Sequence, residues 1–236
     1  MSEARAEVDI AANLARIRER IGRAAERAGR RPEEILLVAV AKGVTPARIR
    51  QAVAAGVTDI AENYVQEAAA KRPEVAEAVR WHLIGHLQRN KAGPAARLFD
   101  IVHTLDSLRL AQALGRRAAE VGRRLDVLIQ VNTSGEPSKS GAAPEEAERL
   151  AEAVAAVEGL RLQGLMTIGR WDPFPERARP EFRLLAEVGR RLQARGLEMR
   201  WLSMGMTHDL EVAIEEGANL VRIGTGIFGP RGPQPA

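Results

Sequence analysis

The feature that most constrains the fold of this chain is a regular alternation of two hydrophobicity patterns. Short apolar runs, typical of parallel strands buried on both faces, alternate with longer segments whose apolar residues recur every three or four positions, as in amphipathic helices. The first apolar run is Ile35–Ala41. Seven more follow, at Asp59–Asn63, Trp81–Gly85, Ile101–Leu105, Val127–Asn132, Leu160–Ile168, Met199–Met204 and Leu220–Phe228.

Helical patterns fill the intervals between these runs. The first begins at Thr45-Pro46, which offers an N-cap and a first-turn proline, and ends near Gly56. The others are expected at Tyr64–Ala78, Gln88–Leu98, Ser107–Val121, Pro144–Val157, Pro180–Ala194 and Thr207–Glu216. Eight such β/α units predict an α/β protein with a (β/α)8 TIM barrel. An open doubly wound sheet is the rival, but its dinucleotide-binding form is disfavoured because no G-x-G-x-x-G follows the first strand.

The two ends of the chain extend this pattern. An additional amphipathic helix, with apolar residues at steps of four and three from Ile10 to Ala28, precedes the first strand. We expect no helix after the last strand, so the N-terminal helix would fill that gap in the outer ring. Residues 1–229 are therefore expected to form a single domain, and residues 230–236 a Pro/Gly-rich tail.

Composition excludes several function classes. The absence of cysteine removes disulfides, zinc–thiolate sites, iron–sulfur clusters and cysteine nucleophiles. The net charge of +4, from 35 basic and 31 acidic residues, is spread along helical patterns beside acids, so no nucleic-acid stripe is expected. No apolar run reaches the roughly 18 residues of a membrane span, and no signal peptide is legible. We therefore expect a cytoplasmic protein that binds neither membranes nor nucleic acids.

Polar side chains at the carboxyl ends of the strands are the candidates for chemistry, because barrel active sites gather there. Lys42 follows Val38 and Val40 on one face of the first strand by the two-residue strand period, which directs it to the barrel mouth. Desolvation there favours the neutral amine, the nucleophile for Schiff-base formation. A lysine that merely reaches water is the alternative. The other candidates are Asn63, His86, Asp106, Asn132, Thr167, Ser203 and the run from Arg222 to Gly226.

The segments after the last two strands predict a phosphate site. Loops at this place hold phosphate in many barrels, and glycines let backbone N–H groups approach an anion closely. Gly224 and the hydroxyls of Ser203 and Thr225 would contribute, although these glycines could also serve only turns and packing. With Lys42, this site implies a phosphorylated carbonyl compound: a sugar phosphate in an aldolase-like reaction, or pyridoxal 5′-phosphate (PLP). Position does not separate the two. No metal site is expected.

Several blocks of sequence resemble the pyridoxal phosphate homeostasis protein family, also called the YggS/PROSC family. They occur in order from the first strand to the last, so the resemblance covers nearly the whole chain. The blocks are Val38–Lys42, Glu62–Glu67, Trp81–Lys91, Gln130–Asn132 with Lys139–Gly141, Gly164–Ile168, Leu202–Met206 and Val221–Gly229. The chain departs from the usual family pattern directly after Lys42, on both sides of Glu62-Asn63, and at Thr207-His208-Asp209.

The resemblance implies a fold-type III PLP-binding barrel, similar to the N-terminal barrel of alanine racemase. It implies that Lys42 carries PLP as a Schiff base. It implies that the phosphate is held by Ser203, Gly224, Thr225 and the backbone near Met204. It further implies that Asn63 and Ile84 line the ring and that Arg222 faces the pyridine nitrogen.

The function expected from this site is that of a PLP-binding protein in intracellular PLP homeostasis, which stores the cofactor or delivers it to PLP-dependent apo-enzymes. A cationic Arg222 would disfavour protonation of the pyridine nitrogen and weaken the ring as an electron sink. Racemisation needs a base on each face of the carbon. We expect no second domain to supply one, and the single tyrosine, Tyr64, is expected at the surface or rim.

Two alternatives remain at this stage: a low-activity PLP-dependent racemase and a Schiff-base aldolase without cofactor. Lys139, in the loop after the fifth strand, is a candidate secondary contact, with a plain surface lysine the favoured interpretation.

Overall fold

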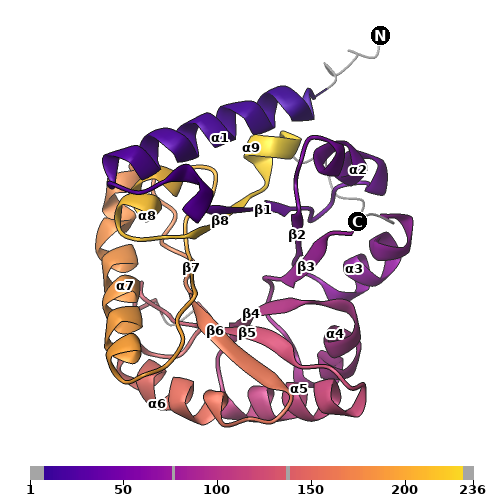
Figure 1. Ribbon diagram of the computed structural model, residues 1–236, viewed down its shortest axis with the longest axis vertical. Coiled ribbons are helices and arrows are strands. Elements are labelled where there is room, and N and C mark those ends of the chain that lie inside the picture. Colours follow the sequence, from indigo (N-terminus) through magenta and orange to yellow (C-terminus); the bar gives the residue numbers. More distant parts are fainter. Residues whose placement is uncertain (1–7, 76–77, 137–138, 231–236) are drawn as a thin grey trace.

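The computed structural model describes residues 8–75, 78–136 and 139–230. Eight parallel strands form a closed barrel in sequence order, with β8 paired to β1 (Figure 1). The predicted (β/α)8 barrel is therefore confirmed. The strands are β1 (Leu36–Val40), β2 (Asp59–Glu62), β3 (Arg80–Leu83), β4 (Ile101–Leu105), β5 (Leu125–Gln130), β6 (Leu160–Met166), β7 (Trp201–Ser203) and β8 (Leu220–Ile223).

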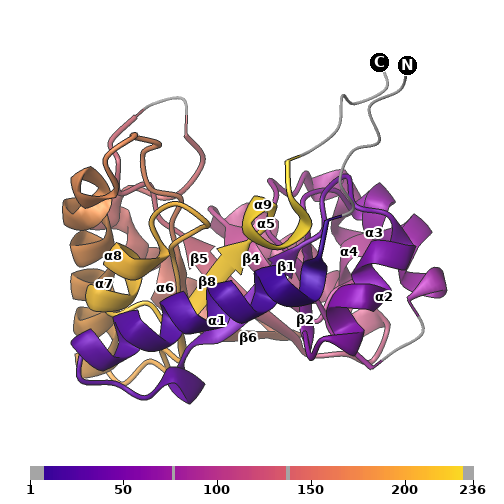
Figure 2. The ribbon, with the colours of Figure 1, turned by 90° about the horizontal axis from the view of Figure 1, so that it is seen from above.

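Helices surround the barrel. The α-helices are α1 (Ile10–Arg27), α2 (Pro46–Ala54), α3 (Val65–Lys71), α4 (Ala92–Leu98), α5 (Leu108–Glu120), α6 (Pro144–Ala155), α7 (Arg179–Ala194), α8 (Leu210–Glu215) and α9 (Thr225–Phe228). Short 3₁₀ turns occur at Pro32–Glu34, Arg72–Glu74, Arg89–Lys91 and Pro175–Ala178. The predicted N-terminal helix is α1, which packs against α2, α8 and α9 and lies across the outside of β1 and β8 (Figure 2).

The structure corrects two predicted elements. The predicted strand Leu220–Phe228 ends at Ile223, and the helix α9 follows it, so the expectation of no helix after the last strand is wrong. The predicted helix Tyr64–Ala78 ends at Lys71, because Pro73 cannot donate the backbone hydrogen bond that would continue it. Of the predicted tail, residues 231–236 lie outside the described residues.

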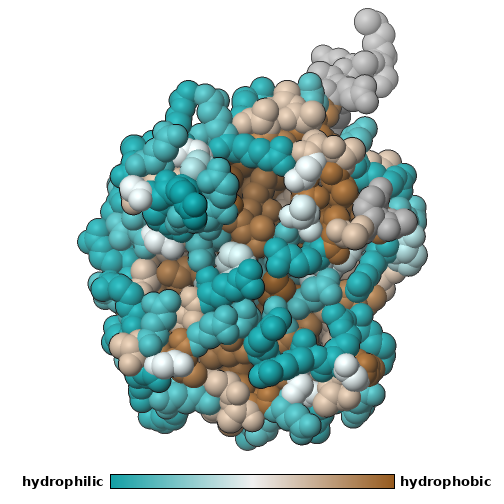
Figure 3. All heavy atoms as spheres, viewed as in Figure 1, coloured by the Kyte–Doolittle hydropathy of each residue, from teal (hydrophilic) through white to brown (hydrophobic). Residues whose placement is uncertain are grey.

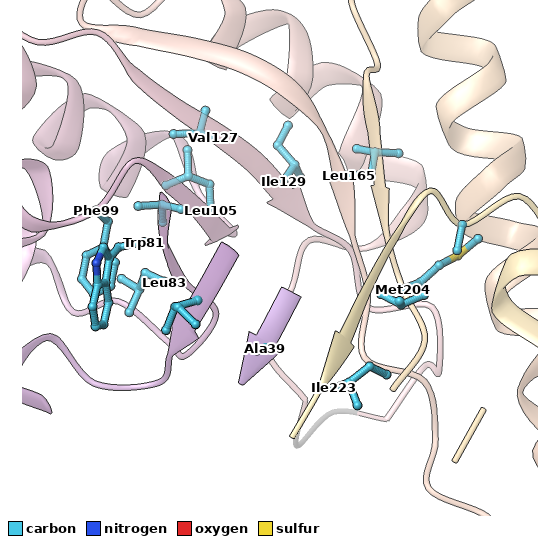
Figure 4. Packing of buried hydrophobic residues seen from close by; sticks show 14 of the residues in the cluster. Ala39, Trp81, Leu83, Phe99, Leu105, Val127, Ile129, Leu165, Met204 and Ile223 are labelled. Atoms are coloured by element: carbon cyan, nitrogen blue, oxygen red, sulfur yellow. The ribbon is translucent and has the colours of Figure 1, made fainter. Parts of the chain in front are cut away.

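The main hydrophobic core lies between the barrel and its helices. Figure 4 shows part of it, with side chains from β1, β3, β4, β5, β6 and β8. The interior of the barrel is filled separately, by one apolar cluster around Val38, Ala61 and Leu220 and another around Ile101, Leu128 and Met166. Because side chains alternate along a strand, every second side chain of β1 points into the barrel. The next position in this series after Val40 is Lys42, which therefore lies at the barrel mouth.

Polar and charged residues cover most of the face seen in Figure 3, with apolar side chains visible between them. Within residues 8–75, 78–136 and 139–230, the structure has no helix whose length and hydropathy would suffice to cross a membrane.

Candidate functional site

Lys42 lies at the carboxyl end of β1, two residues beyond Val40, which packs inside the barrel. Its side chain is half-buried, and Nζ lies 5.1 Å from the centroid of the Tyr64 ring. Tyr64 is 51% exposed, which places it at the rim as predicted. Lys71 is paired with the carboxylates of Glu62 and Glu67, and Lys139 Nζ lies 3.3 Å from Glu136, whereas the Lys42 amine enters no ion pair within the described part of the chain. The amine is therefore available to a ligand.

A cluster outside the barrel holds the peptide groups on either side of Lys42. Lys71 Nζ donates to the carbonyl of Ala41 at 2.9 Å, and Glu67 Oε2 accepts from the N–H of Gly43 at 3.0 Å. Lys71 and Glu67 are themselves paired at 2.7 Å. The backbone of Lys42 is thus fixed from both sides by one helix, α3. Sequence reasoning missed this role, because nothing in the local pattern shows which backbone group a lysine four residues beyond a glutamate will reach.

Glu62 completes this cluster. Its side chain is fully buried, and Lys71 donates to Oε1 at 2.7 Å. Burial raises the pKa of Glu62 to about 7, despite the opposing effect of Lys71. Oε2 is buried with no hydrogen-bond partner among the described residues. A carboxyl group that can be half protonated near neutral pH therefore lies behind the strand end that leads to Asn63.

Gly224 and Thr225 share a small hollow of about 50 Å³ with Lys42. Thr207 contacts the residues beside this hollow: its Oγ1 accepts from the N–H of Gly226 at 3.2 Å and from Thr225 Oγ1 at 3.5 Å. Sequence reasoning did not select Thr207, although it lies in the loop after the seventh strand where phosphate contacts were expected. A hydroxyl residue directly after the Leu202–Met206 block was the available signal.

Ser203 and Met204, the other predicted phosphate contacts, lie elsewhere. Ser203 is fully buried inside the barrel, where its Oγ accepts from Arg222 Nη1 at 2.7 Å. The Met204 side chain packs in the core between sheet and helices (Figure 4), and its N–H donates to Leu220 at 3.1 Å. Neither residue lines the hollow beside Lys42.

A second cavity, of about 230 Å³, brings together Asn63 and Ile84 as the resemblance implies. Its wall is completed by Gly85, His86, Gln130, Val131, Asn132, Lys139, Ser140 and Ile168. A Cβ on Gly85 would stand 2.1 Å from the carbonyl oxygen of Asn63, so only glycine permits this approach of β3 to β2. Lys139 is half-buried in this wall, with Nζ 3.3 Å from Glu136, and is therefore not the plain surface lysine that the sequence favours.

The remaining candidates at the strand ends, His86, Asp106 and Asn132, lie at the rim of the barrel mouth. His86 is exposed, and its Nδ1 lies 3.7 Å from Asp106 Oδ2. Asn132 donates to the carbonyls of Glu136 and Lys139 and so shapes the loop after β5. Within the described residues, no group of three or more His, Cys, Asp or Glu side chains is arranged so that it could hold a metal ion.

Arg222 is a buried cation on the inward face of β8. Its Nη1 donates to Ser203 Oγ, and its Nη2 donates to the carbonyl of Thr167 at 2.8 Å. Burial lowers its pKa to about 10, with Asp209 acting in the opposite direction, so the guanidinium stays charged at neutral pH. Burial also raises the pKa of Asp209, whose Oδ1 accepts from the N–H of Met206 at 2.6 Å.

Comparison with known proteins identifies the family. Residues 12–232 match the family model described as alanine racemase, N-terminal domain. A pyridoxal phosphate homeostasis protein of Pseudomonas aeruginosa is 47% identical over 223 residues, which cover 94% of this chain and 96% of that protein. This chain belongs to the pyridoxal phosphate homeostasis protein family. The family's member in Escherichia coli is 46% identical over 235 residues, covering 94% of this chain and 97% of that protein.

Solved structures agree with this family. PipY of Synechococcus elongatus, solved with PLP bound, has a TM-score of 0.83 and 35% identity, covering 94% of this chain and 100% of that one. A protein of Bifidobacterium adolescentis has a TM-score of 0.89 and 39% identity, covering 93% and 94%. Alanine racemase of Clostridium difficile, at 16% identity and a TM-score of 0.77 over 94% of this chain and 58% of that one, shares the fold. The predicted resemblance to the homeostasis family is confirmed.

Proposed function

We propose that this protein binds PLP reversibly through Lys42 and stores or delivers it in PLP homeostasis. The observation that carries the proposal is the hollow that the Lys42 amine shares with Gly224 and Thr225. PLP bears its aldehyde and its phosphate arm on neighbouring ring carbons, so it needs an amine and an anion site side by side. The relatives named for PLP homeostasis and the PLP-bound structure of PipY support the same function.

Each part of the site has a role in this proposal. When bound, PLP supplies an aldehyde that condenses reversibly with amines and a ring that withdraws electrons. Lys42 would hold the aldehyde end. The hydroxyls of Thr207 and Thr225 and the adjacent backbone would hold the phosphate. Asn63 and Ile84 would line the ring, while the Arg222 guanidinium would face the pyridine nitrogen.

The charges of the site favour a carrier over a racemase. A fixed cation beside the pyridine nitrogen disfavours its protonation and so weakens the ring as an electron sink. The single tyrosine of the sequence, Tyr64, is half exposed at the rim, where a proton exchanges with water. The same exposure would let the amine of a recipient apo-enzyme approach the aldehyde carbon, and we propose PLP-dependent apo-enzymes as the recipients.

The test is visible absorbance after mixing with PLP, followed by borohydride reduction and peptide mass spectrometry. We expect a visible band and a reduced adduct on Lys42, both lost in Lys42→Ala and both retained in the control Lys91→Ala. The chain has four lysines, so the peptide that carries the adduct is readily assigned. An adduct confined to Lys71, Lys91 or Lys139 would contradict the proposal, and amino-acid racemisation at enzyme-like rates would favour the racemase.

A further inference from the structure

A chain of buried polar side chains crosses the interior of the barrel from Arg222 to Asp59. Arg222 Nη1 donates to Ser203 Oγ at 2.7 Å, and Ser203 Oγ lies 3.0 Å from His103 Nδ1. His103 Nε2 lies 2.9 Å from His82 Nδ1, and His82 Nε2 lies 2.8 Å from Asp59 Oδ1. None of the five residues is more than 4% exposed. Five different strands, β8, β7, β4, β3 and β2, therefore contribute to one continuous relay.

The two ends of this relay determine the direction of every hydrogen bond in it. A guanidinium can only donate, and a carboxylate can only accept. Burial acts to raise the pKa of Asp59, but hydrogen bonds from His82 and Thr58 bring it below its ordinary value, so Asp59 is ionised. With both imidazoles neutral, one arrangement satisfies every atom: Ser203 O–H donates to His103 Nδ1, His103 Nε2–H donates to His82 Nδ1, and His82 Nε2–H donates to Asp59.

The surroundings of His103 disfavour an extra proton on this imidazole. Burial comes first, then the charge that His82 carries when protonated, and then Arg222; together they hold the pKa of His103 well below its ordinary value. A charged His103 would also direct a second donor at Ser203 Oγ, which already accepts from Arg222. Asp209 acts on Arg222 at one end, and at the other Arg80 Nε lies 2.8 Å from Asp59 Oδ1. A neutral His103 thus lies between the two charged ends of the relay.

We propose that His82 and His103 are positioning residues, which act through Ser203 to orient Arg222 toward the pyridine ring of the bound cofactor. This role rests on the proposed PLP site. Because the Ser203 O–H donates to His103 Nδ1, a lone pair of Ser203 Oγ is free to accept from Arg222 Nη1, while the Thr167 carbonyl accepts from Nη2. The guanidinium is thus held at both of its terminal nitrogens, and the Ser203 hydroxyl connects it to His103.

The first experiment reads the relay without cofactor. Long-range ¹⁵N–¹H NMR spectra report the tautomer of each imidazole, and His86 and His208, which are exposed, are assigned by His86→Asn and His208→Asn. We expect both remaining histidines, 82 and 103, to carry a proton on Nε2, and His103 to be the neutral Nε2–H tautomer throughout about pH 6 to 8. A neutral Nδ1–H tautomer at either position, or an imidazolium at His103 in that range, would overturn the proposal.

The second experiment separates positioning from stability. We expect His103→Leu to raise the Kd for PLP about tenfold and to move the pH midpoint of the visible band by about one unit. His103→Gln, whose amide has both a donor and an acceptor, should restore most of both values. The control is Gln163→Leu, which removes a buried amide that donates to the Leu162 carbonyl outside the relay, and it should leave both unchanged.

If His103→Leu lowers only the melting temperature and leaves affinity and pH profile as in the wild type, the pair is merely structural and the proposal is wrong. This outcome differs from a failure of the proposed PLP binding. If the protein did not bind PLP, the wild type itself would show no visible band, whatever tautomers the NMR spectra report. The NMR measurement on cofactor-free protein also decides the proposal if His103→Leu does not fold.

Discussion

Lys71 Nζ lies 2.7 Å from Glu62 Oε1, so a helix outside the barrel is tied to the strand next to the one that leads to Lys42. The same ammonium donates to the carbonyl of Ala41, the residue before Lys42. One cation therefore links the stability of the barrel wall to the position of the amine proposed to bind PLP. The charge state of Glu62 should be visible in the stability of the whole protein.

The first prediction concerns pH. Burial raises the pKa of Glu62 to about 7 from an ordinary value of 4.5. Between these values the folded protein retains a proton that the unfolded chain has lost, so stability falls as the pH rises through this window, by up to roughly 3 kcal/mol. Glu62→Gln should abolish this fall, measured by urea unfolding at about pH 5 and about pH 8. Exposed Glu33→Gln is the control, and an unchanged pH dependence in Glu62→Gln would refute the prediction.

The second prediction concerns the ion pair. Lys71→Met leaves the buried Glu62 carboxylate without its cation and should cost about 3 kcal/mol of unfolding free energy at neutral pH or above. The double variant Lys71→Met with Glu62→Leu should recover most of this loss, because no buried charge remains. Chemical denaturation of the three proteins measures both effects. A double variant as unstable as Lys71→Met alone would show that Glu62 is not the cause.

The third prediction tests the close approach of β3 to β2. Gly85→Ala would place a methyl group 2.1 Å from the Asn63 carbonyl oxygen, so the strands must separate. We expect a loss of about 1 to 3 kcal/mol in stability and weaker PLP binding, since Asn63 moves. Gly22→Ala, within helix α1, is the matched control: its Cβ would lie 3.9 Å from Pro32, and it should stabilise by up to about 1 kcal/mol. Unchanged melting and PLP affinity in Gly85→Ala would show that the two strands do not approach so closely.

The fourth prediction assigns the phosphate end. Thr207→Val removes the hydroxyl that contacts Thr225 Oγ1 and accepts from the N–H of Gly226. We expect the Kd for PLP to rise about tenfold and the Kd for pyridoxal, which has no phosphate, to stay the same. Isothermal titration with the two ligands measures the difference, with Ser107→Ala at the start of α5 as the control. An equal loss for both ligands would place Thr207 away from the phosphate.

Much of the fold could be predicted from the sequence because barrel strands obey local rules. Apolar runs buried on both faces, separated by amphipathic segments, indicate the β/α repeat without knowledge of any contact. The two-residue period through Val38 and Val40 then places Lys42 at the mouth, where the structure has it. The predictions failed where a strand or helix ends. In the run Leu220–Phe228, for example, the apolar residues after Ile223 belong to the short helix α9 and not to the strand.

The sequence by itself therefore determined the barrel, the N-terminal helix and the place of Lys42, since each depends on the order of residues within one segment. Only the tertiary structure decided the partners. His103 and Ser203 are 100 positions apart, and nothing in the local sequence indicates that Ser203 Oγ accepts a hydrogen bond from Arg222. The strand period tells which side chains face inward, but closure and register decide which of them meet across the interior, and hydrogen bonds depend on that distance.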